Sequence, residues 1–314
     1  MYYGDFRAIA DTAGFIIVHP EGKLDNNNNT HFNVGWGASS IDDLGFASAL
    51  IDSLLLDYSI NEDRVYSTGM SNGGFMSFHL ACNLSNRIAA IASVTGSMVP
   101  QTMTNCAVGH ATAIMQIHGT SDPTVNYNGT NFISEAVPNV LNYWSSYDNC
   151  DVSPITTNVP NTNTTDGCTA QRIEYLNGDN CTEVVHYKIS GGGHTWPGAP
   201  VVIGTTNYDI NASIEIWKFL SKYDINGKIG CNQTSGLYKE FNMEFLEVYP
   251  NPAIDELIIK GKLSDDLTYQ LLNPLGLVVA SGIINSSIRT IDVSALSSSV
   301  YYLKIADKTV KIIK

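Results

Sequence analysis

The sequence predicts an α/β domain with a mainly parallel sheet, followed by a small antiparallel β-sandwich. Two observations indicate this fold class. In the first two thirds of the chain, short apolar runs rich in β-branched residues alternate with longer segments of helical period, which is typical of βαβ units. In the last quarter, apolar and polar residues alternate in runs of strand length separated by turns. A chain of 314 residues is long enough to bury a large core and a small second one.

The α/β domain is assigned to residues 1–223, and its elements alternate along the chain. The predicted strands are apolar and span residues 14–18, 65–68, 88–94, 112–117 and 184–189. The predicted helices carry apolar residues at helical spacing and span residues 44–55, 73–82, 131–146 and 212–223. Asp42 and Asp43 stand directly before the first predicted helix and are expected to cap it.

Two polar segments interrupt this pattern. Residues 151–167 are almost entirely Asn, Thr, Pro and Asp, which indicates a long surface loop. Residues 224–245 are assigned to a linker, and residues 246–314 to the C-terminal domain. The predicted strands of that domain span residues 256–260, 269–272, 277–280, 300–305 and 310–313.

The balance of charge excludes one class of partner. The chain has 17 Lys and Arg against 30 Asp and Glu, a net charge of −13, which removes the attraction that drives nucleic-acid binding. No apolar run approaches the roughly 18 residues that cross a bilayer. The low charged content, 15%, with many Asn, Ser and Thr, is typical of a secreted protein. We therefore expect no nucleic-acid partner and no membrane span.

The six cysteines predict disulfides rather than a metal site. None has CxxC spacing, and none lies near a His at zinc-finger spacing. An even number in an Asn-rich, Lys-poor chain favours disulfides, and buried free thiols are the alternative. The favoured pairs are Cys82 with Cys106 and Cys150 with Cys181.

The most informative motif is Gly69-Met70-Ser71-Asn72-Gly73, which follows a β-rich run and leads into a predicted helix. Its two glycines permit a sharp strand-to-helix turn that exposes the Ser71 hydroxyl and points the helix N-terminus at it. Such a motif also arises by chance in a chain rich in Gly and Ser, but its setting between strand and helix favours a nucleophile. Ser71 is therefore the candidate nucleophile.

A serine nucleophile needs a base and a carboxylate that orients the base. Asp122 lies in the loop after the predicted strand 112–117, and such loops carry the chemistry of open α/β sheets. His194 follows the strand 184–189 in a glycine-rich loop that offers little packing for a structural histidine. Asp122 and His194 are therefore the candidate acid and base. His118 is an alternative base, but we expect it to support the Asp122 loop.

Four segments together give a specific resemblance: residues 5–11 (DFRAIAD), 69–74 (GMSNGG), 118–122 (HGTSD) and 193–198 (GHTWPG). They resemble the esterase family of polyhydroxybutyrate depolymerases, which includes the feruloyl and acetylxylan esterases of carbohydrate esterase family 1. The resemblance covers about residues 3–223. It implies an α/β-hydrolase fold, no cofactor, and the triad already reached from chain order.

The resemblance also implies a role for each residue. Ser71 attacks an ester carbonyl, His194 moves the proton to the leaving alcohol, and Asp122 orients the imidazole. The backbone N–H of Asn72 supplies one half of the oxyanion hole. In the family the second donor lies upstream of residues 5–11, so the chain is expected to lack its N-terminal strands and that loop, as an internal start or a truncated gene would produce.

Trp36 and Trp196 are the candidate substrate-binding residues. Trp196 directly follows the His194 loop, and Trp36 lies in a short glycine-containing segment, residues 33–37 (NVGWG). Both are suited to an apolar or aromatic acyl group. The alternative is that they are core or lid tryptophans.

The C-terminal domain resembles a type A sorting domain of the type IX secretion system. The resemblance rests on residues 248–252 (VYPNP), 273–276 (NPLG), 291–296 (IDVSAL), 300–303 (VYYL) and 311–314 (KIIK). It implies export across the outer membrane, contact with the type IX machinery and removal of this domain. A carbohydrate-binding sandwich is the alternative.

The sequence thus predicts a secreted serine esterase that acts through an acyl-enzyme. Its substrate is expected among polyesters of the polyhydroxybutyrate type and feruloyl or acetyl esters of plant walls, and the residues do not choose between them. Two other hypotheses remain: a catalytically impaired binding protein on an esterase scaffold, and a serine peptidase on the same fold.

Overall fold

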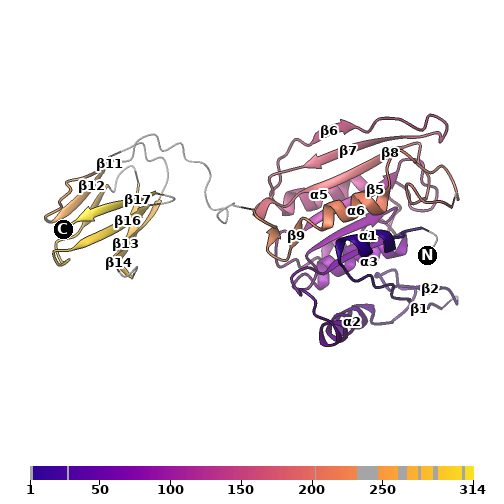
Figure 1. The fold of residues 1–314 in the computed structure, drawn as a ribbon, viewed down its shortest axis with the longest axis horizontal. Coiled ribbons are helices and arrows are strands. Elements are labelled where there is room, and N and C mark those ends of the chain that lie inside the picture. The colour runs from indigo at the N-terminus through magenta and orange to yellow at the C-terminus, as the bar shows by residue number, and fades with distance from the viewer. Residues whose placement is uncertain are drawn as a thin grey trace. The chain divides into compact units, whose positions relative to one another are not determined.

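The computed structural model separates the chain into two compact units, residues 1–235 and 236–314 (Figure 1). It describes residues 3–26, 28–201, 203–231, 247–260, 267–274, 277–285, 289–305 and 308–314. Residues 232–245 of the expected linker lie outside this part. Among the described helices, none combines the length and the apolar composition that crossing a bilayer requires.

The first unit is built on a six-stranded mixed sheet. The strand order is β3-β4-β5-β8-β7-β6, with β3, β4, β5 and β8 parallel to one another and β7 and β6 antiparallel. The bounds are β3 (Tyr66–Met70), β4 (Ala90–Val94), β5 (Ala113–Gly119), β8 (Val184–Ser190), β7 (Thr169–Tyr175) and β6 (Ile155–Asn158). The predicted α/β class is confirmed, and the antiparallel pair is an addition to it.

Helices cover both faces of this sheet. Their bounds are α1 (Arg7–Ala13), α2 (Asp43–Asp57), α3 (Asn72–Asn83), α4 (Pro100–Thr104), α5 (Val137–Tyr147) and α6 (Ala212–Leu220). Along β4, Ala92 packs with α6 in one core cluster, whereas Ile91 packs with α3 and α5 in the other. Since successive strand residues point to opposite faces, a strand buried on both is a continuous apolar run. That is why residues 88–94 were recognisable as a strand.

The helix starts follow capping rules. The side chain of Asp42 accepts a hydrogen bond of 2.8 Å from the backbone N–H of Gly45, and Asn211 caps α6 through Ile214 in the same way. The helix expected over 131–146 begins only at Val137, with a proline in its first turn. The preceding residues form a turn, which is closed by a bridge between Thr130 and Ser134.

Residues 14–18, a predicted strand, do not form one. Phe15 stacks on Trp217 with 3.9 Å between ring centroids, and Ile16 remains half exposed. The apolar run therefore packs on the core through Phe15 and Ile17 without backbone pairing. Within the described sheet, β3 is consequently an edge strand.

The residues expected to form the polar loop 151–167 include β6, whose four residues are all exposed. Among the described strands, β6 pairs with β7 alone, and β7 was not predicted either, because its side chains are largely polar. Backbone pairing, and not burial of an apolar face, makes this hairpin a pair of strands. Apolar periodicity gives no signal for such strands.

One predicted disulfide is confirmed and the other is wrong. Cys82 is bonded to Cys106, but Cys181 is bonded to Cys231, which leaves Cys150 and Cys168 as free thiols. The hairpin of β9 (Tyr223–Asp224) and β10 (Gly227–Lys228) packs against the short 3₁₀ helix Asp179–Cys181 and so brings residue 231 to Cys181. Residues 224–231 therefore belong to the first unit rather than to the linker.

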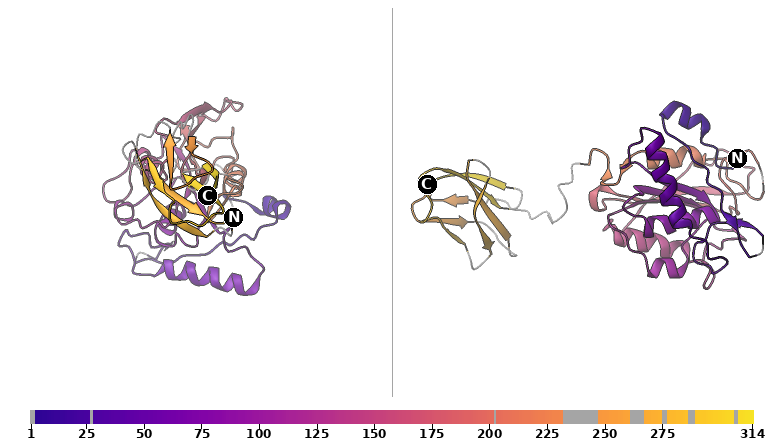
Figure 2. Two further views of the ribbon diagram at one scale, coloured as in Figure 1. Left: turned by 90° about the vertical axis from the view of Figure 1, so that its left-hand side faces the viewer. Right: turned by 90° about the horizontal axis from the view of Figure 1, so that it is seen from below.

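The second unit is an antiparallel β-sandwich, as predicted. One sheet has the order β11-β12-β15 and the other β14-β13-β16-β17, and Figure 2 shows these strands from two further sides. The bounds are β11 (Glu247–Tyr249), β12 (Glu256–Lys260), β13 (Leu267–Leu272), β14 (Val278–Ile284), β15 (Thr290–Asp292), β16 (Val300–Ile305) and β17 (Lys308–Ile313). Leu257 and Ile259 of one sheet and Leu271 and Leu303 of the other share one core cluster.

Candidate active site

The candidate residues lie at one edge of the first sheet. Ser71 follows β3, Asp122 follows β5, and His194 follows β8. β3, β4, β5 and β8 are parallel and adjacent, so their carboxyl ends meet at the same edge. Ligand and catalytic sites of open α/β sheets form at that edge.

Ser71 occupies a strained turn between β3 and α3. Its backbone angles are φ 55° and ψ −120°, a positive φ that residues with a side chain rarely adopt. The turn is held by a 2.9 Å hydrogen bond from the Ser71 N–H to the carbonyl of Val94. A Cβ added at Gly69 would stand 2.5 Å from the backbone of Gly73, so the close approach of strand and helix requires glycine. Strain of this kind costs about 1–3 kcal/mol and is found where function demands it.

The N-terminus of α3 directly follows Ser71. Asn72 is the first residue of α3, and the first N–H groups of a helix have no partner within it. The side-chain amide of Asn72 pairs with the backbone of Phe32, accepting from its N–H at 2.7 Å and donating to its carbonyl at 3.0 Å. This pairing uses only the side chain of Asn72, so its backbone N–H remains at the turn next to Ser71.

Asp122 is buried, and its carboxylate is well supplied with donors. Oδ1 accepts the backbone N–H of Thr124 at 2.8 Å and that of Val125 at 2.9 Å. Burial alone would raise the pKa of Asp122, but hydrogen bonds from His118, His194 and these two N–H groups outweigh it and hold that pKa well below its ordinary value. Asp122 is therefore a carboxylate at any pH near neutrality.

His194 is in direct contact with Asp122. Its Nδ1 lies 2.8 Å from Oδ2 of Asp122, and its side chain is 17% exposed. Because a carboxylate only accepts, Nδ1 carries a ring proton, and in the neutral form of the ring Nε2 holds the lone pair. The loop is fixed by a 2.9 Å hydrogen bond from Ser121 N–H to the Gly192 carbonyl. No hydrogen bond joins His194 to Ser71, both of which belong to the described residues.

The two tryptophans have different surroundings. Trp36 is 36% exposed; its ring packs edge-on against Phe75, with 4.9 Å between centroids, and its indole N–H donates to the Ile133 carbonyl at 2.9 Å. Since Phe75 lies one helical turn after Ser71, Trp36 is close to the nucleophile turn. Trp196 is 3% exposed, packs on Phe6 and belongs to the core. For Trp196 the structure therefore fits the alternative, a core tryptophan.

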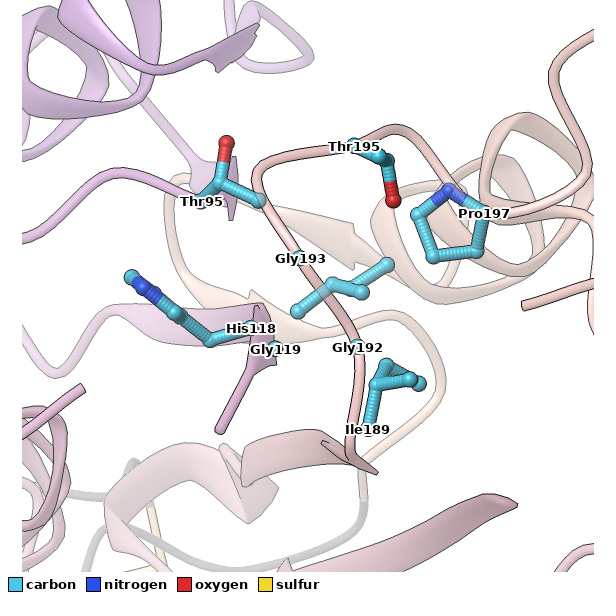
Figure 3. A pocket seen from close by; sticks show the side chains of 9 residues that line it. Thr95, His118, Gly119, Ile189, Gly192, Gly193, Thr195 and Pro197 are labelled. Carbon is cyan, nitrogen blue, oxygen red and sulfur yellow. The ribbon is translucent and has the colours of Figure 1, made fainter. Parts of the chain in front are cut away.

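A small pocket lies beside the His194 loop (Figure 3). Its lining includes Thr95, His118, Gly193 and Thr195. Thr95 directly follows β4, has a φ of 49°, and its buried hydroxyl has no hydrogen-bond partner. A β-branched residue at positive φ is an outlier that sequence patterns give no means of finding. Among the described residues, no three His, Cys, Asp or Glu side chains are grouped as metal ligands would be.

Two protein families match this chain. Residues 42–157 match the family described as phospholipase/carboxylesterase, a range that includes Ser71 and Asp122. Residues 247–314 match the secretion system C-terminal sorting domain. The second match confirms the type IX sorting domain expected from the sequence and the export that it implies.

Curated relatives are named as esterases. The chain is 25% identical over 232 residues to a bifunctional acetylxylan esterase/xylanase, XynS20E, of Neocallimastix patriciarum, covering 74% of this chain and 30% of that protein. It is 24% identical over 255 residues to a putative esterase, NocK, of Nocardia uniformis, covering 69% of this chain and 68% of that protein. It is 32% identical over 126 residues to feruloyl esterase D of Neurospora crassa, covering 40% of this chain and 39% of that protein.

The chain thus spans less than half the length of two of these relatives. The match to the carboxylesterase family is nevertheless consistent with the six-stranded α/β sheet. Residues 42–157 thus match a carboxylesterase family within an α/β fold, and residues 247–314 match a secretion-system sorting domain.

Proposed function

We propose that the first unit is a serine esterase whose triad is Ser71, His194 and Asp122. One observation carries the proposal: a serine in a strained strand-to-helix turn lies at the sheet edge where a buried carboxylate already orients a histidine. Strain and orientation are both features of nucleophilic serine sites.

The reaction follows from the protonation states of these groups. Nε2 of His194, whose lone pair is free, takes the proton of the Ser71 hydroxyl as the oxygen attacks the ester carbonyl carbon. The backbone N–H of Asn72 donates to the oxyanion. His194 then gives the proton to the alcohol oxygen as the C–O bond breaks, leaving an acyl-Ser71. Water, activated by His194, hydrolyses this ester and restores the serine.

The proposed substrates are carboxylic esters of plant-wall polysaccharides or of a polyester. Relatives named as acetylxylan and feruloyl esterases favour the first group. The exposed edge of Trp36 beside the nucleophile turn supports an apolar or aromatic acyl group. Polyesters such as polyhydroxybutyrate contain the same ester bond and are the second group. The C-terminal unit is proposed to contact the type IX machinery and to be removed on export.

The test is release of p-nitrophenol from short-chain acyl esters by the full chain. Ser71→Ala is expected to reduce hydrolysis to background, because no other group in the proposed site can form the acyl-enzyme. Ser53→Ala, on the exposed face of α2, is the matched control and keeps the activity. Methyl ferulate, acetylated xylan and polyhydroxybutyrate then rank the substrate classes.

Two outcomes contradict the proposal. Hydrolysis that persists in Ser71→Ala would show that Ser71 is not the nucleophile. A folded chain that hydrolyses none of these esters favours the alternative, a binding protein on an esterase scaffold, for which the missing hydrogen bond between Ser71 and His194 is the supporting observation. Hydrolysis of a panel of amide substrates would identify a serine peptidase instead.

A further inference from the structure

Asp122 has a second histidine neighbour that the proposed triad does not use. The ring of His118 is fully buried, and its Nε2 lies 3.4 Å from Oδ2 of Asp122, the oxygen that also contacts His194. The same Nε2 lies 2.8 Å from the carbonyl oxygen of Val125. Both oxygens are acceptors, so Nε2 of His118 carries a proton and shares it between them.

The other ring nitrogen of His118 is fixed by Gln116. The side-chain nitrogen of Gln116 lies 2.8 Å from the Gly96 carbonyl and 2.9 Å from Nδ1 of His118. Because a carbonyl only accepts, this nitrogen is a donor, and its two protons serve the two contacts. Nδ1 of His118 is therefore an acceptor. The ring is neutral, with its proton on Nε2.

These contacts complete the environment of the Asp122 carboxylate. Oδ1 takes the backbone N–H groups of Thr124 and Val125, and Oδ2 faces the rings of His118 and His194. Val125 is held from both sides, because its N–H donates to Asp122 and its carbonyl accepts from His118. His118 thus restrains the carboxylate directly and through the loop that carries it.

The groups that face His118 from neighbouring elements are Tyr127, His186 and Lys188. The Tyr127 ring meets His118 edge-on at 5.8 Å, and its hydroxyl contacts Nε2 of His186 at 3.0 Å. Burial lowers the pKa of His186 to about 3, so that ring is neutral. The Nζ atom of Lys188 lies over the ring of Tyr127, 6.0 Å from the ring centroid. Asp122 is therefore the charged group in contact with His118.

We propose that His118 is a positioning residue that holds the Asp122 carboxylate in the orientation His194 requires, acting as a neutral donor whose tautomer Gln116 selects. The inference rests on the proposed function, since it assigns a role within that site. His118 touches no reacting atom, and its effect passes through Asp122.

Two substitutions separate the two nitrogens of His118. In His118→Gln, the side-chain nitrogen reaches the position of Nε2 and keeps the donor toward Asp122 and Val125. In His118→Asn, the side-chain oxygen takes the position of Nδ1, which keeps the contact with Gln116 but loses that donor. We expect kcat to fall on the order of 10-fold in His118→Asn, with KM little changed. In His118→Gln, we expect most of the parent kcat to be retained.

A double-mutant cycle tests whether the effect passes through Asp122. In the Asp122→Asn background, His118→Asn is expected to cost little further activity, because the carboxylate that it positions is gone. Equal losses in His118→Asn and His118→Gln, or additive losses in the cycle, overturn the proposal. Thermal unfolding of each variant identifies losses that arise from unfolding.

Nuclear magnetic resonance of ring nitrogens provides a readout that does not need activity. We expect the ring proton of His118 to lie on Nε2, as its hydrogen-bond partners require, and His118→Asn, unlike His118→Gln, to shift the Nδ1–H signal of His194. A His118 ring whose proton lies on Nδ1 overturns the proposal. A chain inactive on every ester contradicts the proposed function, and this measurement then decides the role of His118 by itself.

Discussion

The side-chain amide of Asn72 pairs with both backbone groups of Phe32, at 2.7 Å and 3.0 Å, as a neighbouring strand would. Asn72 follows Ser71 in the chain, whereas Phe32 belongs to the segment that leads to Trp36. The residue after the candidate nucleophile therefore also fixes the segment that carries a candidate substrate-binding tryptophan. One side chain thus couples two parts of the site that lie 40 positions apart in the sequence.

Asn72→Ala removes this pairing while it leaves the backbone N–H of residue 72 in place. We expect amide exchange at Phe32 to accelerate and the free energy of unfolding to fall by about 1–3 kcal/mol, the value of two hydrogen bonds. Hydrogen exchange and urea unfolding measure the two effects. Asn139→Ala, an exposed asparagine on α5, is the control. Unchanged exchange at Phe32 would show that the segment is held by other contacts.

Trp36→Ala is expected to raise KM for esters with aromatic acyl groups and to change kcat little, because Trp36 lies beside the nucleophile turn and takes no part in the proposed proton transfers. Trp36→Phe keeps an aromatic ring and should recover part of the affinity. Steady-state kinetics with methyl ferulate and with an acetyl ester make the comparison. A fall in kcat that is equal for both esters would mean that Trp36 supports the fold of the site rather than the substrate.

The disulfide pattern predicts the labelling of cysteines. Iodoacetamide added to the unfolded, unreduced chain should modify Cys150 and Cys168 and leave the other four cysteines unmodified. Peptide mass spectrometry after digestion reads this directly. A linked peptide pair containing Cys150 and Cys181 would restore the pairing first expected from the sequence.

Removal of the Cys82–Cys106 bond by a Cys82→Ala, Cys106→Ala double variant should cost about 2–4 kcal/mol of unfolding free energy. The bond closes a loop of 24 residues, whose freedom in the unfolded chain the crosslink restricts. Cys168→Ala, at a buried free thiol, is the control for loss of side-chain volume. Equal losses in the two proteins would attribute the effect to packing.

Asp148 predicts a dependence of stability on pH. It is fully buried; Oδ1 accepts the Thr112 N–H at 3.0 Å and Oδ2 has no partner. Burial, with the nearby Asp179, raises the pKa of Asp148 to about 8 despite the Thr112 hydrogen bond. Because the pKa of Asp148 is higher in the folded chain than in the unfolded chain, where it is near 4, the folded state is favoured while the carboxyl group is protonated. This stabilisation is lost as the pH rises from about 4 toward 8.

The side chain of residue 148 in Asp148→Asn cannot ionise, so this variant does not lose stability as the pH rises. Its melting temperature relative to the parent is therefore expected to rise between pH 4 and about 8 and to level off above. Thermal unfolding across this range measures the difference, with Asp57→Asn at the exposed end of α2 as the control. A difference that does not vary with pH would show that Asp148 does not change its charge in this range.

Several features of the protein follow from local sequence. The strand β4, Ala90–Val94, is buried on both faces, and the helix after Asp42 has an apolar stripe and a cap, so each is encoded by its own residues. Ser71, Asp122 and His194 were recognisable because loops after parallel strands meet at one sheet edge. The alternation after residue 246 likewise predicted the β-sandwich, and its motifs predicted the sorting domain.

Other features depend on partners that are distant in the chain. Cys181 bonds Cys231 because the β9–β10 hairpin folds back on it, and Trp196 is a core residue because Phe6 packs on its ring. The exposed strand β6 exists through pairing with β7. Periodicity records which face a residue buries, but not which segment it meets. The sequence by itself determined the apolar strands of the parallel sheet, most helices and the chain order of the candidate triad. Only the tertiary structure decided the exposed strands and the neighbours of each element, because these depend on contacts between segments that are distant in the chain.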